Sequence, residues 1–387
     1  MFFLGRKLNM KFIIQRDQLM ASIQDVMKAI SARAAIPILT GIKVDADENG
    51  VTLTGSDSNI SIESYIPAEE DGIVNVEDIQ GGSIVLQANY FPDVIRKLPE
   101  KTVEIETDDQ FNVMIRSGKA EFKLNGQDAE EYPQLPKLQI DNSFEINTDL
   151  LKGLIHQTAF AISTMETRPI LTGVNIKLEN SNLSFTATDS HRLAVKEVPL
   201  DGVQLELSNI VIPGKSLNEL YKILDDTEET IEVSATDNLI LFRTKYIYFL
   251  SRLLDGNYPE TSRLIPDGGK TVLHAKTRDL ISTIDRASLL AKEERNNVVK
   301  LTTKDNDIID ITSNSPEVGK VAEDIAIESV TGEELKISFS AKYMLDALKA
   351  IESDEVTIDF TGAMRPFVIR PASKEPIIQL ITPVRTY

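Results

Sequence analysis

The sequence predicts an α+β protein made of three tandem similar domains, each with two helices packed on antiparallel sheets. The first observation is an internal repeat. Residues 168–195 align without a gap on residues 36–63, so that Pro-Ile-Leu-Thr-Gly at 169–173 falls on the same five residues at 37–41. The second observation is that one order of strand and helix patterns recurs three times, with the third copy the most diverged. We therefore expect an extension at 1–9 and domains at 10–137, 138–268 and 269–387.

The first domain should open with a strand at 11–15 and a helix from Arg16 to about Ser31, where apolar residues recur at three- and four-residue spacings. A hairpin follows, because residues 42–46 and 51–54 alternate apolar and polar side chains across Asn49-Gly50, a favoured pair for a tight turn. Strands at 61–67 and 82–87, a short helix near 90–97, and two or three further strands complete the unit.

The second and third domains repeat this order. In the second, we expect helices at about 148–163 and 216–224, the hairpin at 168–195, and strands at 143–147, 209–213, 230–235, 239–244 and 247–254. In the third, we expect helices at 277–290 and 341–351, and strands at 271–275, 298–303, 308–314, 335–340, 355–360, 367–371 and 377–384.

Composition limits the function. The chain has 387 residues, 42% of them hydrophobic, and a net charge of −19, so the protein as a whole should repel nucleic acid and anionic membranes. It has no cysteine, which excludes disulfides and a cysteine nucleophile and fits a cytoplasmic location. No apolar run is long enough to cross a membrane, and the opening apolar run is too short for a secretory signal.

Two segments have residues that could carry chemistry. Asp45, Asp47 and Asn49-Gly50 match the first half of a calcium loop, but Ser56 stands where the bidentate Glu is required, so a plain hairpin turn is the better interpretation. His191 follows Asp189 and Ser190, yet neighbours on an extended strand point to opposite faces, which separates a serine nucleophile from its base. We therefore expect no catalytic residue, no metal site and no cofactor.

Basic residues gather on the predicted helices although the protein is acidic. Equivalent helices of repeats could place them on one surface, which would hold a phosphate backbone without reading bases. Ordinary solvated helix faces are the alternative, and the residues alone favour that alternative. The apolar end at 377–384 is either a closing strand or one wall of a hydrophobic groove.

A set of short motifs decides between these alternatives. It comprises Met-Lys-Phe at 10–12, both Pro-Ile-Leu-Thr-Gly segments, Ala-Thr-Asp-Ser-His-Arg-Leu-Ala at 187–194, Asp-Gly-Asn-Tyr-Pro at 255–259 and Thr-Pro-Val-Arg-Thr-Tyr at 382–387. From Met10 onward, the chain resembles the bacterial DNA polymerase III beta subunit family, the replication sliding clamps. That resemblance overturns the preference for solvated helix faces.

The resemblance implies a non-catalytic processivity factor that closes into a six-domain ring around duplex DNA as a head-to-tail homodimer. Its partners would be double-stranded DNA, a second copy of itself, the replicative polymerase alpha subunit, the clamp loader, and other polymerases and repair proteins that dock short linear motifs. No membrane is involved, and the protein would be associated with the nucleoid during replication. The alternative is a monomeric peptide-binding scaffold built from the same repeats without DNA encirclement.

The resemblance also assigns residues. The partner-peptide groove between the second and third domains would use Leu171, Thr188, His191, Arg192, Leu193, Pro259, Leu264, Ser340, Tyr343, Met364, Pro366, Leu380, Ile381, Thr382, Pro383, Val384 and Arg385. DNA contacts would come from Arg33, Arg168, Arg96, Lys97, Lys215, Lys222, Arg295 and Lys342, and the dimer contact from Phe122, Leu124, Leu289 and Leu290. Ser190 stands where the family often has Gly, Ser340 where Asn can occur and Thr382 where Met can occur.

Overall fold

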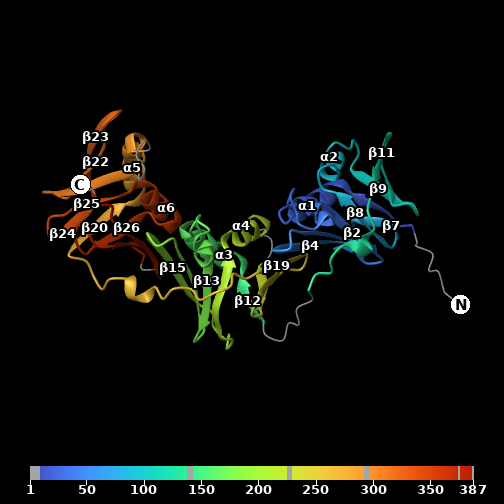
Figure 1. Ribbon diagram of the computed structural model, residues 1–387, viewed down its shortest axis with the longest axis horizontal. Coiled ribbons are helices and arrows are strands. Elements are labelled where there is room, and N and C mark those ends of the chain that lie inside the picture. The colour runs from blue at the N-terminus through green and yellow to red at the C-terminus, as the bar shows by residue number, and fades with distance from the viewer. Residues whose placement is uncertain (1–8, 137–142, 225–228, 292–296, 374, 386–387) are drawn as a thin grey trace. The chain divides into compact units, whose positions relative to one another are not determined.

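The computed structural model describes residues 9–136, 143–224, 229–291, 297–373 and 375–385 (Figure 1). The chain forms two compact units. The first comprises Met1–Thr148 and Glu219–Arg252, and the second comprises Asp149–Asn218 and Leu253–Tyr387. The central repeat therefore contributes strands to both units. No helix of the described residues is long and apolar enough to cross a membrane.

The first unit is mainly antiparallel sheet with helices packed on it. Its elements are β1 (Lys11–Gln15), α1 (Arg16–Met27), β2 (Gly41–Asp47), β3 (Gly50–Ser56), β4 (Ile60–Pro67), β5 (Glu69–Glu70), β6 (Ile73–Val74), β7 (Val76–Gln80), β8 (Gly82–Gln87), α2 (Phe91–Arg96), β9 (Thr102–Thr107), β10 (Asn112–Ser117), β11 (Ala120–Asn125), β12 (Ser143–Asn147), β17 (Thr230–Ala235), β18 (Leu239–Arg243) and β19 (Ile247–Arg252).

The second unit has the same character. Its elements are β13 (Gly173–Glu179), β14 (Asn182–Thr188), β15 (Arg192–Pro199), β16 (Leu207–Pro213), β20 (Thr271–Lys276), α5 (Thr277–Ala291), β21 (Val298–Lys304), β22 (Ile308–Ser315), β23 (Gly319–Ala326), β24 (Ser329–Gly332), β25 (Lys336–Ser340), α6 (Ala341–Ile351), β26 (Glu355–Phe360), β27 (Phe367–Pro371) and β28 (Ile377–Ile381). Two helices run across the division between the units: α3 (Thr148–Thr158) and α4 (Gly214–Ile223).

In the first unit, strands of two repeats join one sheet. Among the described residues its order is β12-β17-β18-β19-β4-β3-β2-β8, and β19 pairs antiparallel with β4 so that Tyr248 faces Glu63. A second sheet has the order β11-β10-β9-β1-β7, with β11 at one edge. The sheets support α1, which buries Leu19, Ile23 and Val26 and lies next to α2 (Figure 1).

In the second unit, the central and C-terminal repeats share a sheet as well. Its order among the described residues is β16-β13-β14-β15-β28-β27-β26-β20-β24, and β15 pairs antiparallel with β28. A buried polar cluster lies at this junction: Lys196 Nζ donates to Gln157 Oε1, and Gln379 Nε2 donates to the Gln157 carbonyl oxygen at 3.0 Å. Burial lowers the pKa of Lys196. The pairing of β15 with β28 therefore holds the central and C-terminal repeats together in one sheet.

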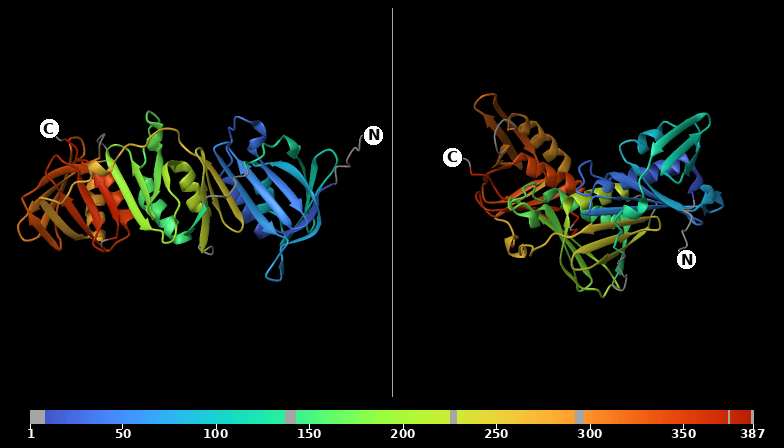
Figure 2. Two further views of the ribbon diagram at one scale, coloured as in Figure 1. Left: turned by 90° about the horizontal axis from the view of Figure 1, so that it is seen from below. Right: turned by 45° about the vertical axis from the view of Figure 1, so that its right-hand side comes forward.

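The C-terminal repeat encloses a large apolar core. Helices α5 and α6 lie side by side (Figure 2) and bury Leu280, Ile284 and Met344. Phe367 packs against Phe339 with ring centroids 5.7 Å apart. Such packing gives α6 and the edge of β28 a rigid support.

Most predicted elements are confirmed, but several bounds differ: α3 ends at Thr158, short of 163, and β28 ends at Ile381, short of 384. Helix α1 ends at Met27, short of Ser31, and both Pro-Ile-Leu-Thr segments are 3₁₀ turns that precede their hairpins. The strands β5, β6, β7, β23 and β24 were not predicted; β7 and β23 carry several charged residues, and β5, β6 and β24 have at most four residues each. The hairpin at Asn49-Gly50 is confirmed: the backbone N–H groups of both residues donate to Asp47 Oδ1.

Candidate functional site

The floor of the candidate groove is the β15–β28 junction. There Leu193 faces Leu380 and Arg192 faces Ile381. Leu193 and Leu380 are buried in a small apolar cluster with Val195 and Val368. Residues almost two hundred positions apart are therefore neighbours in one sheet.

The turn from Thr188 to Arg192 forms one side of this surface. Asp189 Oδ1 accepts hydrogen bonds from the backbone N–H groups of His191 at 2.9 Å and Arg192 at 3.0 Å. Thr188 Oγ1 donates to the Arg192 carbonyl oxygen at 2.5 Å. Ser190 has a φ of 78°, in the left-handed region that glycine adopts most easily. Asp189, Ser190 and His191, which the sequence offered as an acid, a hydroxyl and an imidazole, therefore belong to a structural turn.

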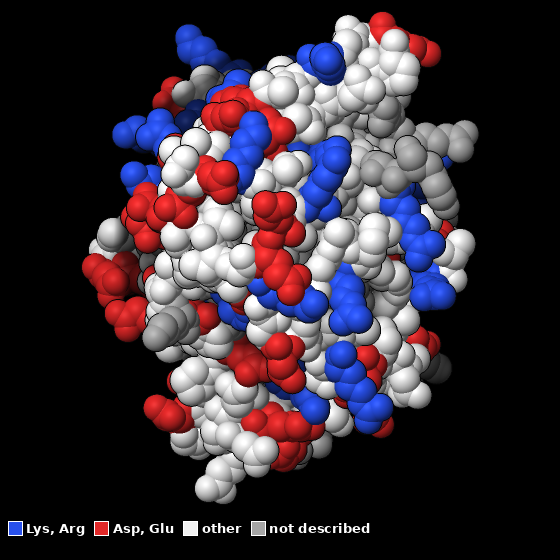
Figure 3. Space-filling view, turned by 90° about the vertical axis from the view of Figure 1, so that its left-hand side faces the viewer, with Lys and Arg blue, Asp and Glu red and all other residues white. Residues whose placement is uncertain are grey.

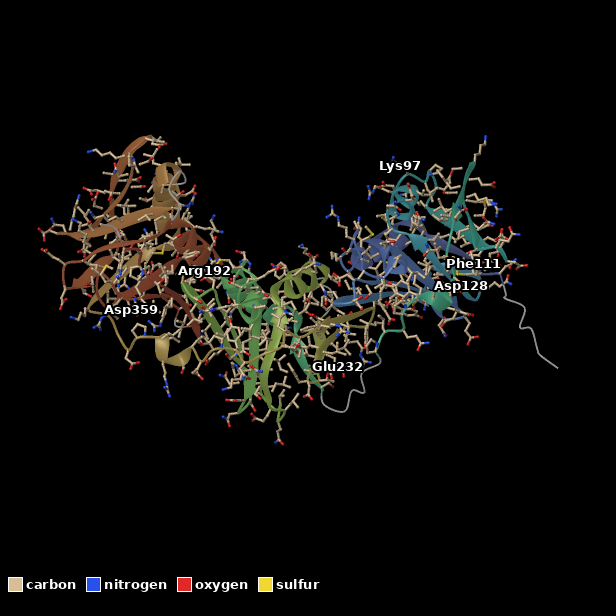
Figure 4. All side chains as sticks on the ribbon, in the orientation of Figure 1. Lys97, Phe111, Asp128, Arg192, Glu232 and Asp359 are labelled. Atoms are coloured by element: carbon tan, nitrogen blue, oxygen red, sulfur yellow. The ribbon has the colours of Figure 1, made fainter. Side chains whose placement is uncertain are left out.

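Arg192 is buried at the junction, with 8% of its surface exposed (Figure 4). Its guanidinium contacts two carboxylates: Nε lies 3.1 Å from Asp189 Oδ2, and Nη1 lies 2.7 Å from Asp346 Oδ2 on α6. The guanidinium carbon also lies 4.6 Å from the centre of the Tyr343 ring. Burial and the nearby Asp189 carboxylate raise the pKa of Tyr343. Arg192 thus positions α6 against the turn, and sequence reasoning missed Asp346 because nothing in the sequence relates residues so far apart.

The C-terminal tail crosses this region and is held at two points. The backbone N–H of Thr382 donates to the His191 carbonyl oxygen at 2.9 Å, and the Thr382 hydroxyl donates to the same oxygen at 2.8 Å. The backbone N–H of Val384 donates to the Ser338 carbonyl oxygen at 2.8 Å. His191 itself is exposed. The tail is therefore an ordered wall, with Pro383 half-buried between its two attachment points.

The remaining groove candidates form supports and a rim. Tyr258 Oη accepts a hydrogen bond from the Thr188 backbone N–H at 2.9 Å, and burial raises the pKa of this phenol. Ser340 caps α6, since its Oγ accepts from the Tyr343 N–H at 3.5 Å. The others divide by exposure: Leu171 and Ile381 are buried, Pro366 is half-buried, and Pro259, Leu264, Met364 and Arg385 are exposed. Exposed apolar side chains beside a packed floor are typical of a protein-docking surface.

Replacing Arg192 by Ala should destabilise the second unit. The change leaves Asp189 and Asp346 without their cation, so we expect the free energy of unfolding to fall by about 2–4 kcal/mol. Denaturant unfolding measures this. Arg243→Ala is the matched control, because Arg243 forms an ion pair with Glu232 at 2.5 Å but is largely solvated, and its loss should cost no more than about 1 kcal/mol. Equal effects of the two changes would contradict a structural role for Arg192.

The second candidate site is a set of basic helix positions. In each repeat a strand (β8, β16 or β25) leads into a helix, and the last turn of that helix carries Arg96, Lys222 or Lys349. Lys349 is one of the basic residues on the predicted helices, but it is not among the DNA contacts that the resemblance assigns. Arg96 pairs with Asp93 at 3.0 Å and Lys222 with Glu219 at 2.9 Å. Such exposed ion pairs are weak and can be exchanged for phosphates.

The other predicted DNA contacts are also at the surface. Arg33, Arg168, Lys97, Lys215 and Lys342 are all exposed, whereas Arg295 lies outside the described residues. Figure 3 shows one face of the C-terminal part, where Lys and Arg are interspersed with Asp and Glu. Basic and acidic side chains are therefore mixed on that face, although the protein as a whole is acidic.

The predicted dimer residues lie on an edge strand of the first unit and on a helix of the second unit. Phe122 is 39% exposed and Leu124 is half-buried on β11, the edge of its sheet. Leu289 is 60% exposed and Leu290 is half-buried on α5, which packs against β22 and β23. Strand β23 is itself a sheet edge. Edge strands with exposed apolar side chains are ready to pair with another chain.

The fold and these surfaces define a repeat-built binding protein. Among the described residues, no group of His, Asp and Glu side chains is placed to hold a metal ion. Models of the N-terminal, central and C-terminal domains of the DNA polymerase III beta subunit match residues 10–136, 145–260 and 262–385. The chain therefore belongs to the DNA polymerase III beta subunit family, and its function is that of a non-catalytic DNA polymerase sliding clamp with three tandem clamp domains.

Individual relatives agree with this assignment. The beta sliding clamp of Bacillus subtilis (strain 168) is 58% identical over 380 residues, which covers 98% of this chain and 100% of the relative. The crystal structure of the DNA polymerase sliding clamp from Bacillus subtilis matches with a TM-score of 0.94 over 98% of this chain and all of the other. The beta chain from Streptococcus pneumoniae, 41% identical, also gives 0.94, over 97% of this chain and all of the other.

Proposed function

We propose that two copies of this clamp close head to tail into a ring of six domains, with domains at 10–137, 138–268 and 269–387, and that the ring encircles duplex DNA without sequence specificity. The observation that carries the proposal is the basic residue in the last turn of the second helix of every repeat. If the ring brings these helices inward, six repeats place equivalent cations around the DNA. Contacts to phosphates alone hold any sequence and exchange easily, which suits a protein that slides.

The dimer would form between unlike edges of two chains. Strand β11 of one copy would meet the β23 edge of the other, and Phe122 would pack against Leu289 of the partner subunit. An interface between two different surfaces is heterologous, and such an interface closes into a ring when its rotation allows it. A monomeric scaffold would instead leave both edges unpaired.

Leu289→Asp should therefore convert the dimer to monomers. A carboxylate at an apolar contact removes burial and leaves an unpaired charge, so we expect the dimer dissociation constant to rise at least roughly 30-fold, or ~2 kcal/mol. Sedimentation equilibrium measures it. Met165→Asp is the matched control, since Met165 and Leu289 are each 60% exposed. A wild-type protein that sediments as one chain would support the scaffold alternative.

The groove would hold short linear motifs of the replicative polymerase alpha subunit, the clamp loader, other polymerases and repair proteins. Its support is the packed floor of Leu193 and Leu380, the ordered tail, and the exposed Leu264 and Met364 at the rim. A peptide whose apolar side chains cover this rim would bury them against a rigid surface, the usual arrangement of a binding hot spot. The clamp would act at the nucleoid while replication proceeds.

A further inference from the structure

A cavity of about 510 Å³ lies in the second unit, beside two residues of the proposed groove. One wall is the loop after the 3₁₀ turn Ser262–Leu264, and the other is the turn between β26 and β27. Leu264 and Pro366, both predicted groove residues, line the cavity. The cavity therefore shares two residues with the proposed partner-peptide groove.

The polar part of the lining is mainly cationic. Arg263, Lys270 and Arg365 line the cavity together with a single carboxylate, that of Asp267. Lys270 lies 3.7 Å from Glu333, and both side chains are largely exposed. Within the described part of the chain, neither Arg263 nor Arg365 forms an ion pair. In a protein with a net charge of −19, unpaired arginines around one cavity favour an anionic ligand.

Two of these arginines have an exposed apolar residue as their neighbour in the chain, and one of those neighbours, Leu264, lines the cavity. Leu264, 55% exposed, directly follows Arg263, and Met364, 56% exposed, directly precedes Arg365. A phosphate backbone would satisfy the arginines but would leave the apolar side chains in water. A peptide that carries acidic residues next to apolar ones matches both features. The lining therefore favours an acidic peptide over nucleic acid.

We propose that this cavity, which we call the basic end, binds acidic side chains that flank the apolar anchor of a partner peptide. The inference rests on the proposed groove function and adds a charge requirement to it. Partners with an acidic flank bind more tightly than partners with the same anchor and a neutral flank. The preference weakens as salt screens the exposed charges.

The test uses two fluorescent peptides made from the groove-binding segment of the replicative polymerase, one flanked by glutamates and one by glutamines. Fluorescence anisotropy with the full-length protein should show about 10-fold tighter binding of the glutamate peptide at low salt, and little difference at high salt. In R263Q/R365Q the preference should fall below about 2-fold while the glutamine peptide binds as before. The matched control is K276Q/K320Q, which removes two exposed lysines outside the cavity.

Charge reversal gives a second readout. R365E should lose affinity for the glutamate peptide and gain affinity for a peptide flanked by lysines, which a folding defect could not produce. Equal binding of the two original peptides to the wild type would overturn the basic end while leaving the groove intact. Binding of neither peptide would overturn the groove and this proposal together. If the arginine changes reduce binding of a short DNA duplex but leave the peptide preference unchanged, the cavity is a DNA contact and the proposal is wrong.

Discussion

Deleting Thr382–Tyr387 is expected to weaken binding of a polymerase peptide by at least about 100-fold, because the deletion removes one wall of a groove in which few residues supply most of the binding energy. The deletion begins after β28, which ends at Ile381, so the buried Leu380 and Ile381 keep their places in the sheet. Among the described residues, the deletion removes the hydrogen bonds from Thr382 to His191 and from Val384 to Ser338.

Three measurements decide this prediction. Fluorescence anisotropy gives the peptide affinity, sedimentation gives the oligomeric state, and thermal unfolding should show a shift of no more than about 5 °C. Deletion of Met1–Leu8 is a control of similar length that should leave peptide binding unchanged. Peptide binding that survives the loss of the tail would place the groove elsewhere, and loss of the dimer would make the tail a structural element.

The triple variant Arg96→Ala, Lys222→Ala and Lys349→Ala is expected to reduce the salt dependence of DNA binding strongly. Each phosphate contact contributes roughly 0.9 to the slope of log affinity against log salt, so six lost contacts per dimer would lower the slope by up to about 5. Binding of linear duplex at several salt concentrations measures the slope.

The matched control removes equal charge from positions outside the helices. Lys119, Lys276 and Lys320 are exposed and lie at turns or on strands, so their replacement by Ala should leave the slope nearly unchanged. Cations in the last helical turn also interact with the helix dipole, at roughly 0.3–1 kcal/mol each, so circular dichroism must confirm that the helices persist. Equal slopes for the two triple variants would mean that the helix ends do not contact DNA.

Local signals predicted the local structure well. The Asn49-Gly50 hairpin and most helices follow from side-chain periodicity and turn chemistry that act within a few residues. Helix α1 was predicted too long because apolar residues such as Ile30 continue the pattern past Met27, where the chain turns instead. Strand β23 escaped prediction because none of its residues is buried.

Long-range structure left little trace in the sequence. The pairing of β15 with β28 and of β19 with β4 joins different repeats, and no local pattern specifies either register. The Arg192–Asp346 ion pair joins residues 154 positions apart and was invisible for the same reason. The apolar C-terminal end suggested one wall of a groove, but the other groove residues could be proposed only through family resemblance. The cationic lining of the basic end emerged only when the loops at 263–270 and 361–366 were seen together.

The most direct test of the ring is whether topology holds the protein on DNA. The protein is loaded onto nicked circular DNA by a matching clamp loader, and the circle is then cut once at a distant site. We expect the protein to stay on the intact circle and to leave the DNA once the circle has been cut. A ring held by weak phosphate contacts slides to any free end. Retention that does not change on cutting would show that the protein grips DNA directly, and the encircling ring would be wrong.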